Sequence, residues 1–139
     1  MVELRPVTHE DEAVWYQYDR HLPKREFALK VRDGRGYVIL DEGVTVGVLR
    51  YNLFWDVLPC LTLIYLDDER RGVGIGRAAM ALWEDEMRGA EHEAVMTTTQ
   101  VDEDAQHFYR KLGYVDKGSV VFDVEPFVQP MEMVMMKKL

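Results

Sequence analysis

A chain of 139 residues is long enough for one domain with a hydrophobic core of its own, and its 47% hydrophobic and 30% charged residues are typical of a water-soluble globular protein. The formal net charge of −8 disfavours nucleic-acid binding, and no apolar run approaches the about 20 residues that cross a bilayer. Cys60 is the single cysteine and no histidine pair has metal-ligand spacing, so we expect neither a disulfide nor a metal site.

The first third of the chain predicts one strand and two helices. Val2–Pro6 alternates well enough between apolar and polar residues to indicate a strand. The pattern Thr-x-x-Asp that begins at Thr8 is typical of a helix N-cap, and the helix that follows is expected to end near Leu22 and Pro23. A second helix is predicted over Lys24–Val31.

A β-hairpin is predicted next, followed by a buried strand. The two β-rich runs Tyr37–Leu40 and Val44–Phe54 flank a short turn at Asp41–Gly43. A loop over Trp55–Pro59 leads to Leu61–Leu66, whose apolar and β-favouring residues indicate a buried strand.

The C-terminal half alternates helices and strands. Apolar residues at helical spacing from Ile75 predict a long helix with Gly89 as its C-cap. A strand is predicted over Ala94–Gln100, and a short helix over Asp102–Leu112 with Asp102 as its N-cap. Two last strands are predicted over Tyr114–Val124, with a break near Lys117, and over Met131–Lys137. The chain therefore predicts the α/β class, a mixed sheet with helices packed on it.

The stretch Leu61–Met80 places a strand, a glycine-rich turn and a helix in that order. Such an order presents unpaired backbone N–H groups at a helix N-terminus, where the helix dipole favours negative charge, and glycines let a phosphate approach those groups. Two common phosphate motifs do not fit. Arg77 stands where the dinucleotide fingerprint needs its third glycine, and the Gly-Lys-Ser/Thr of nucleoside-triphosphate loops is absent. A phosphate-binding loop of another kind is predicted.

The loop is Arg71-Gly72-Val73-Gly74-Ile75-Gly76, and its Arg-x-x-Gly-x-Gly pattern resembles the acyl-CoA pyrophosphate loop of the GCN5-related N-acetyltransferase (GNAT) family. A second segment, Asp102–Tyr114, also resembles this family. The resemblance is carried there by Ala105, Phe108, Tyr109, Lys111, Gly113 and Tyr114. The segment departs from the family at Asp102, where asparagine is common, so an amide contact to CoA would differ there. The close resemblance covers roughly Leu61 to Tyr114.

The resemblance implies that residues 1–139 form a single N-acetyltransferase domain. Its central sheet would be mixed and mostly antiparallel, with flanking helices and with Leu61–Leu66 and Ala94–Gln100 as a splayed parallel strand pair. Acetyl-CoA would be the acyl donor, Tyr109 the acid that protonates the departing thiolate, and the backbone N–H of Leu66 the donor to the thioester oxygen. The residues implied to bind the acyl-CoA are Leu66, Arg71, Gly72, Val73, Gly74, Ile75, Gly76, Arg77, Asp102, Ala105, Phe108, Tyr109 and Lys111.

The acceptor side is less defined. Trp55, Asp56 and Tyr65 are the candidates for contact with an amine substrate, and the general base is Asp56, Glu103, the hydroxyl of Tyr65 or a water chain. Acidic clusters, such as the one at Glu10–Glu12, suggest that the amine is cationic.

We predict an N-acetyltransferase that moves an acetyl group from acetyl-CoA to a primary amine, on a small molecule or a peptide, by direct attack in a ternary complex. It is expected to act as a monomer or homodimer in the cytoplasm, because the N-terminus lacks the layout of a signal peptide, with no nucleic-acid or membrane partner. The alternative is a non-catalytic acyl-CoA-binding or sensing module, which would be free to lose Tyr109. A nucleotide-binding domain is disfavoured by the glycine spacing.

Overall fold

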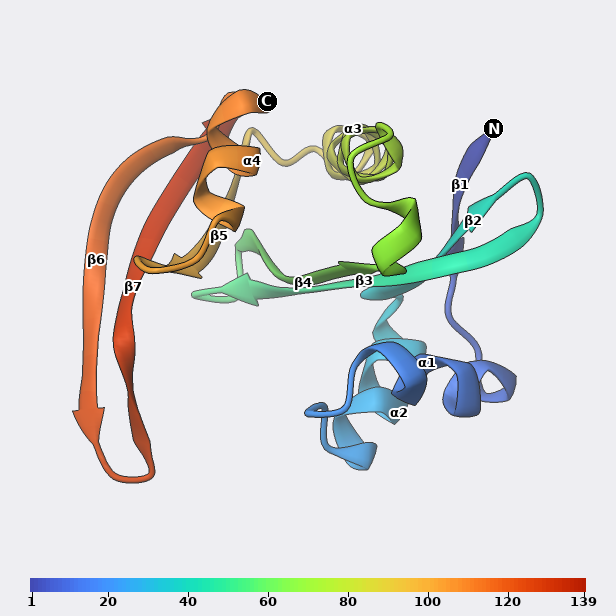
Figure 1. Cartoon of the computed structure of the whole chain (residues 1–139), viewed down its shortest axis with the longest axis horizontal. Coiled ribbons are helices and arrows are strands. Elements are labelled where there is room, and N and C mark those ends of the chain that lie inside the picture. Colours follow the sequence, from blue (N-terminus) through green and yellow to red (C-terminus); the bar gives the residue numbers. More distant parts are fainter. The chain divides into compact units, whose positions relative to one another are not determined.

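The computed structural model describes residues 1–139 and contains one seven-stranded sheet in the order β1-β2-β3-β4-β5-β7-β6 (Figure 1). The pairs β1–β2, β2–β3, β5–β7 and β6–β7 are antiparallel, and β4–β5 is parallel. The predicted α/β class, with a mostly antiparallel sheet and one parallel pair, is confirmed. The strands are β1 (Val2–Pro6), β2 (Gly36–Asp41), β3 (Val44–Phe54), β4 (Leu58–Leu66), β5 (Ala94–Gln100), β6 (Val115–Val124) and β7 (Phe127–Lys138). The helices are η1 (His9–Asp11), α1 (Glu12–Tyr18), α2 (Lys24–Asp33), η2 (Asp68–Arg70), α3 (Ile75–Gly89) and α4 (Ala105–Lys111), where η marks a 3-10 turn.

Residues 1–52 and 62–86 form one compact unit. Figure 1 shows α1 and α2 on one side of β2 and β3, and α3 on the other side. Trp15 of α1 is fully buried, and its ring lies 5.8 Å from that of Phe27 in α2. Because both rings also pack with Val38 and Val48 of the sheet, the two short helices are held mainly by this core.

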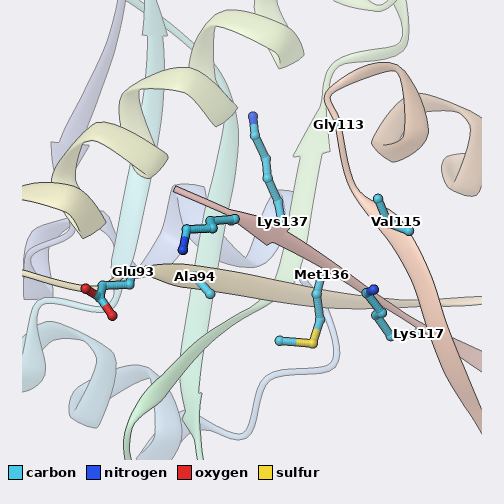
Figure 2. Close-up of a pocket in the computed structure, with 8 residues that line it drawn as sticks. Glu93, Ala94, Gly113, Val115, Lys117, Met136 and Lys137 are labelled. Carbon is cyan, nitrogen blue, oxygen red and sulfur yellow. The ribbon is translucent and has the colours of Figure 1, made fainter.

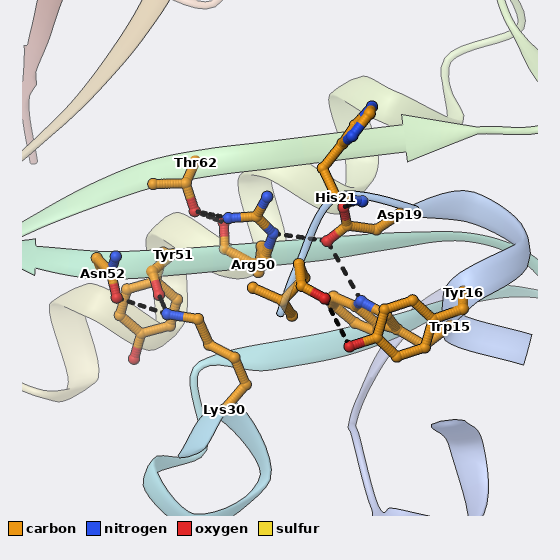
Figure 3. Close-up of polar contacts among 10 residues, drawn as sticks. Trp15, Tyr16, Asp19, His21, Lys30, Arg50, Tyr51, Asn52 and Thr62 are labelled. Carbon is orange, nitrogen blue, oxygen red and sulfur yellow. Dashed lines mark hydrogen bonds and ion pairs between the residues drawn. The ribbon is translucent and has the colours of Figure 1, made fainter. Parts of the chain in front are cut away.

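A buried polar network fastens α1 and α2 to β3 (Figure 3). Asp19, which follows α1, accepts bonds from the Nε of Arg50 at 2.7 Å and from the indole N–H of Trp15 at 3.3 Å. Lys30 of α2 donates to the backbone oxygen of Tyr51 at 2.9 Å, and its burial lowers the pKa of the ammonium group to about 8. Each buried charge thus has hydrogen-bond partners, as burial requires.

Residues 53–61 and 87–139 form a second compact unit. Parallel pairing joins Cys60 to Met96 and Leu61 to Thr97, and the Thr97 hydroxyl donates to the backbone oxygen of Leu61 at 3.1 Å. β7 pairs with β5 from Glu132 to Lys138. β6 and β7 run side by side as a long hairpin, orange and red in Figure 1.

Several element boundaries differ from the predictions, and α1 ends at Tyr18 rather than near Leu22 and Pro23. β7 begins at Phe127 rather than Met131, because Pro130 lies at a register shift in the β6–β7 pairing, where a missing N–H is tolerated. β4 begins at Leu58, so the predicted loop at Trp55–Pro59 is only a short turn. α4 begins at Ala105, three residues after the predicted cap. None of the helices combines the length and apolarity that a membrane crossing requires.

Candidate active site

The glycine-rich loop lies between the end of β4 at Leu66 and the start of α3 at Ile75, with η2 just before it. Gly72 and Gly74 have φ angles of 76° and 92°, a conformation that favours glycine. A Cβ at either position would meet no heavy atom within 4 Å. The backbone of the loop is therefore open to a ligand, and the first turn of α3 presents its N–H groups beside it.

Arg71 is held in place although it is half exposed. Its Nε donates to the backbone oxygen of Leu66 at 3.3 Å, and its Nη1 lies 3.1 Å from a carboxylate oxygen of Asp68. The guanidinium also lies over the ring of Tyr65, 4.9 Å from the ring centre. These contacts fix a positive charge at the loop, where an anionic group would be stabilised.

The remaining loop residues divide into an anchor and an open surface. Ile75 is buried and packs the first turn of α3 onto the core, whereas Val73 is 69% exposed and Arg77 is also exposed. Gly76 lies within the helix. The structure thus brings Leu66 and the loop residues Arg71 to Arg77 together at one end of β4.

The end of β4 approaches β3 very closely at Gly47. A Cβ on Gly47 would lie 2.1 Å from the backbone oxygen of Tyr65 and 3.1 Å from the Cα of Leu66, and no real contact is as short as the first. The backbone N–H of Asp67 donates to the oxygen of Val46 at 2.9 Å. A glycine is therefore needed to let β3 support the strand end that precedes the loop.

Asp67, at the end of β4, is a residue beside the loop that the sequence analysis missed, and it contacts Tyr18 of α1. The Tyr18 hydroxyl is hydrogen-bonded to Asp67, and burial with this bond raises the pKa of Tyr18 to about 12. The Tyr18 ring lies 6.3 Å from that of Tyr65. Since Tyr65 itself is 41% exposed, the three residues form a half-open aromatic and acidic surface next to the loop. The signal in the sequence was weak, because tyrosines in a short helix are usually core residues.

Tyr109 of α4 lies in the second unit and is buried, with 6% of its surface exposed. Its ring packs against those of Phe108 and Tyr114, with centres 5.4 Å and 5.7 Å away. The hydroxyl is hydrogen-bonded with Thr97, whose own hydroxyl donates to the backbone oxygen of Leu61 at 3.1 Å. Burial raises the pKa of Tyr109 to about 12, so the group stays protonated at neutral pH. Thr97 is a second residue that the sequence analysis missed, although three consecutive threonines marked its strand.

The segment before α4 corrects the predicted helix start. Asp102 is exposed and does not cap the helix; the residue before the first helical residue, Ala105, is Asp104. The chain forms a turn here instead, in which the backbone N–H of Glu103 donates to the backbone oxygen of Gln100. The side-chain amide of Gln106 donates to the backbone oxygens of Val101 and Glu103, each at 2.9 Å. Asp102, before α4, and Lys111, the last residue of α4, are both exposed.

The residues predicted to contact the acceptor amine, or to act as its base, lie in separate turns of the chain. Trp55 and Asp56 form the β3–β4 turn with φ angles of 53° and 64°, an uncommon conformation for residues other than glycine or asparagine. Trp55 is 80% exposed and lies 4.6 Å from the ring of Phe54 between centres. Glu103, a candidate base, is exposed in the turn before α4.

A separate pocket of about 620 Å³ lies where β5 and β6 begin and β7 ends (Figure 2). Its lining includes Glu93, Gly113 and Met136, and none of the predicted site residues. Lys117 and Lys137 point in different directions in Figure 2, so their ammonium groups do not converge on one ligand. No group of three or more His, Cys, Asp or Glu side chains could hold a metal ion.

Comparisons with known proteins bear on the family and on the fold. The model of the Acetyltransferase (GNAT) family matches residues 2–114. Ard1 from Thermoplasma volcanium superposes with a TM-score of 0.81 at 17% identity, over 99% of this chain and 97% of that chain. Arabidopsis thaliana Naa50, solved with the bisubstrate analogue CoA-Ac-MVNAL, gives a TM-score of 0.77 at 17% identity over 99% of each chain. The spermidine/spermine N-acetyltransferase SpeG from Vibrio cholerae gives 0.78 at 14% identity, over 99% of this chain and 92% of that chain. No curated protein matches the sequence.

Proposed function

The chain belongs to the Acetyltransferase (GNAT) family, and from this premise we propose that it transfers an acetyl group from acetyl-CoA to a primary amine by direct attack in a ternary complex. We propose further that residues 1–139 act as one catalytic domain. The observation that carries the proposal is the pair of elements described above. The open glycine loop with its oriented Arg71 suits a pyrophosphate, and the buried Tyr109 is a neutral acid.

The loop suits the donor on chemical grounds. Positive φ at Gly72 and Gly74, with empty space where side chains would stand, leaves backbone N–H groups accessible to phosphate oxygens. Arg71 adds a fixed positive charge. We assign the pyrophosphate to residues 71–77, and further contacts with the donor to Leu66, Asp102, Ala105, Phe108, Tyr109 and Lys111.

The proposed chemistry has one bond-forming and one bond-breaking step. The amine nitrogen attacks the thioester carbonyl carbon, and the backbone N–H of Leu66 donates to the carbonyl oxygen as that oxygen gains charge. The carbon–sulfur bond then breaks, the sulfur takes the proton of the Tyr109 hydroxyl, and the nitrogen gives its proton to a base or to water. Tyr109 regains a proton from solvent before the next turnover. A tyrosine whose pKa is about 12 remains available as the donor across the neutral range.

Cys60 supports direct transfer over an acetylated enzyme. A covalent route needs a nucleophile, and the thiolate is the reactive form of cysteine. Cys60 is the only cysteine, and burial raises the pKa of its thiol to about 11. At neutral pH only about one thiol in ten thousand is then ionised, so Cys60 is a poor acceptor for the acetyl group.

For the acceptor we propose a primary amine on a peptide or a polyamine. Naa50 was solved with a peptide-based analogue, and SpeG is a polyamine enzyme. The acidic clusters contribute less than their number suggests, because Asp11 is paired with Arg5 at 2.9 Å and Glu12 with Lys24 at 3.1 Å. Tyr65, beside the loop, and Trp55, in the β3–β4 turn, remain the side chains assigned to acceptor contact.

The test is a thermal-unfolding series followed by a thiol-release assay. Acetyl-CoA at one hundred times its dissociation constant adds about 2.7 kcal/mol of stability, which for a chain of this length raises Tm by roughly 9 °C. ATP and NAD at equal concentration are the controls and should raise Tm much less. Thiol release with a panel of peptide amines and polyamines then measures turnover. An unchanged Tm at millimolar acetyl-CoA refutes the donor, and a raised Tm without turnover on any amine favours the non-catalytic binding module.

A further inference from the structure

Glu132 of β7 is a half-buried carboxylate in the second unit, outside the set of residues assigned so far. Its Oε1 accepts a hydrogen bond from the hydroxyl of Thr98 at 3.1 Å, and its Oε2 accepts one from the side-chain amide of Gln129 at 3.1 Å. Both donors are neutral, and the charged side chain that acts on Glu132 is Glu103, another acid. A carboxylate with neutral and acidic neighbours is poorly stabilised as an anion, and such groups are candidates for proton transfer.

This environment makes Glu132 a better proton acceptor than an ordinary surface carboxylate. Burial raises the pKa of Glu132, the negative charge of Glu103 adds to the increase, and the two hydrogen bonds offset only part of it. A higher pKa favours transfer of a proton from an ammonium group to the carboxylate. Asp56 and Glu103, which the sequence predicts as alternative bases, are both exposed.

Glu132 lies across β5 from the proposed acid, Tyr109. The Tyr109 hydroxyl is hydrogen-bonded with Thr97, whereas Glu132 is bonded to Thr98, the next residue of the same strand. Because successive side chains of a strand point to opposite faces, the acid and the carboxylate lie on opposite faces of β5. The parallel pairing of β5 with β4 is found at Met96 and Thr97 and not beyond, so the edge of β5 is open from Thr98 onward. An acyl group held at this edge can be approached from two sides.

Those two sides correspond to the two proton transfers of the reaction. The leaving sulfur and the arriving nitrogen occupy different positions around the carbonyl carbon, so the acid and the base are also needed at different positions. Tyr109 serves the sulfur from one face. On the other face the Thr98 hydroxyl gives its hydrogen to Glu132, so the lone pairs of its oxygen remain available to an N–H of the amine.

We propose that Glu132 is the general base of the acetyl transfer and takes the amine proton through the hydroxyl of Thr98, an inference that rests on the proposed function. The ammonium passes one proton to the Thr98 oxygen while the hydroxyl proton moves to Glu132, which leaves a neutral amine with a lone pair for the attack. After the carbon–nitrogen bond has formed and the carbon–sulfur bond has broken, the nitrogen loses its second proton to water. Glu132 then releases its proton to solvent.

The variant Glu132→Gln is the direct test, because glutamine keeps the size and an accepting oxygen but does not take up a proton at neutral pH. At pH 7, kcat/KM for a cationic primary amine should fall on the order of 10²-fold, while the calorimetric affinity for acetyl-CoA stays native. The loss should shrink as the pH approaches the pKa of the amine, because the solution then supplies neutral amine. Glu93→Gln is the matched control, at an exposed position just before β5, and should keep kcat/KM within about two-fold.

Substitutions at Thr98 test the path of the proton. Thr98→Val removes the hydroxyl at nearly constant shape and should cause a loss similar to that of Glu132→Gln, with the same dependence on pH. Thr98→Ser retains the hydroxyl and should recover most of the activity, which a defect in packing alone would not predict.

Native kcat/KM in Glu132→Gln, a loss of equal size at every pH, or a Thr98→Ser variant as impaired as Thr98→Val each overturns the proposal. A larger loss in Glu103→Gln than in Glu132→Gln would make Glu103 the base instead. If the native chain binds acetyl-CoA but turns over no amine, the proposed function fails and this base fails with it. Turnover by the native chain that Glu132→Gln retains in full removes the base alone.

Discussion

Replacing Tyr109 by phenylalanine removes one hydroxyl and leaves the ring in its packing against Phe108 and Tyr114. Thr97 keeps its bond to the backbone oxygen of Leu61, so the loss of stability should stay near 1 kcal/mol, the usual net contribution of one hydrogen bond. The turnover should fall far more, by on the order of 10²-fold or above, because a positioned acid contributes 10²–10⁴-fold. The lower bound corresponds to about 2.7 kcal/mol in the barrier.

Steady-state kinetics with acetyl-CoA and a saturating amine separates the two effects. For Tyr109→Phe we expect kcat to fall while the KM for acetyl-CoA changes less than about two-fold, because no donor-binding charge is touched. Tyr114→Phe is the control, since it removes a hydroxyl from the adjacent buried ring and should keep kcat within about two-fold. A Tyr109→Phe enzyme with native kcat, or one whose loss lies in KM alone, refutes the assignment of Tyr109 as the acid.

The raised pKa of Tyr109 also has a sign that pH can test. Since the folded value, about 12, exceeds the ordinary value of 10.0, the acid remains protonated and kcat should show no alkaline loss from this group below about pH 10. The associated stability is intact below pH 10. It falls as pH rises toward 12, because the unfolded tyrosine ionises first. In chemical denaturation, the native chain should therefore have a lower free energy of unfolding at pH 11 than at pH 9. The difference between the two pH values should be smaller for Tyr109→Phe, which lacks the ionising hydroxyl.

Three further predictions concern the loop, the strand beneath it and the acceptor. Gly74→Val should abolish CoA binding, as measured by calorimetry. Gly34→Val is the control, because Gly34 has a similar φ of 67° and equally open surroundings; it should lose comparable stability, about 1–2 kcal/mol, and keep its CoA affinity. Normal CoA affinity in Gly74→Val would place the pyrophosphate elsewhere. Gly47→Ala should lower the free energy of unfolding by about 1–3 kcal/mol or more, because the new Cβ would lie 2.1 Å from the backbone oxygen of Tyr65. Gly89→Ala, whose Cβ would have no neighbouring heavy atom within 4 Å, is the control and should be neutral or stabilising. Equal unfolding free energies of the two variants would contradict the close approach of β3 and β4. If the acceptor is cationic, kcat/KM for cationic amines should fall with ionic strength while that for neutral amines of similar size does not, and a shared salt dependence would argue against electrostatic attraction.

Local sequence patterns predicted the parts of the fold that depend on neighbouring residues. The alternation and length of the apolar runs placed β1, β3 and β5, and the glycines after Leu66 placed the turn before α3. A positive φ angle can be predicted from the sequence because glycine alone adopts it without strain, and an apolar alternation can be read within a short window.

Contacts between distant segments could not be predicted in the same way. The bond between Thr97 and Tyr109 and the pairing of Asp19 with Arg50 depend on which strands become neighbours, which no local pattern encodes. The start of α4 was missed for a related reason, because the amide of Gln106 satisfies the backbone before the helix and an aspartate cap at Asp102 is not needed.

The three tryptophans give the protein two kinds of intrinsic fluorescence reporter. Trp15 and Trp83 are fully buried in one unit, whereas Trp55 is 80% exposed at the β3–β4 turn of the other. A soluble quencher such as iodide therefore reaches Trp55 alone in the native state, and the unquenched, blue-shifted emission comes from the buried pair. Changes at the turn and unfolding of the core can thus be followed in separate channels of one unlabelled sample.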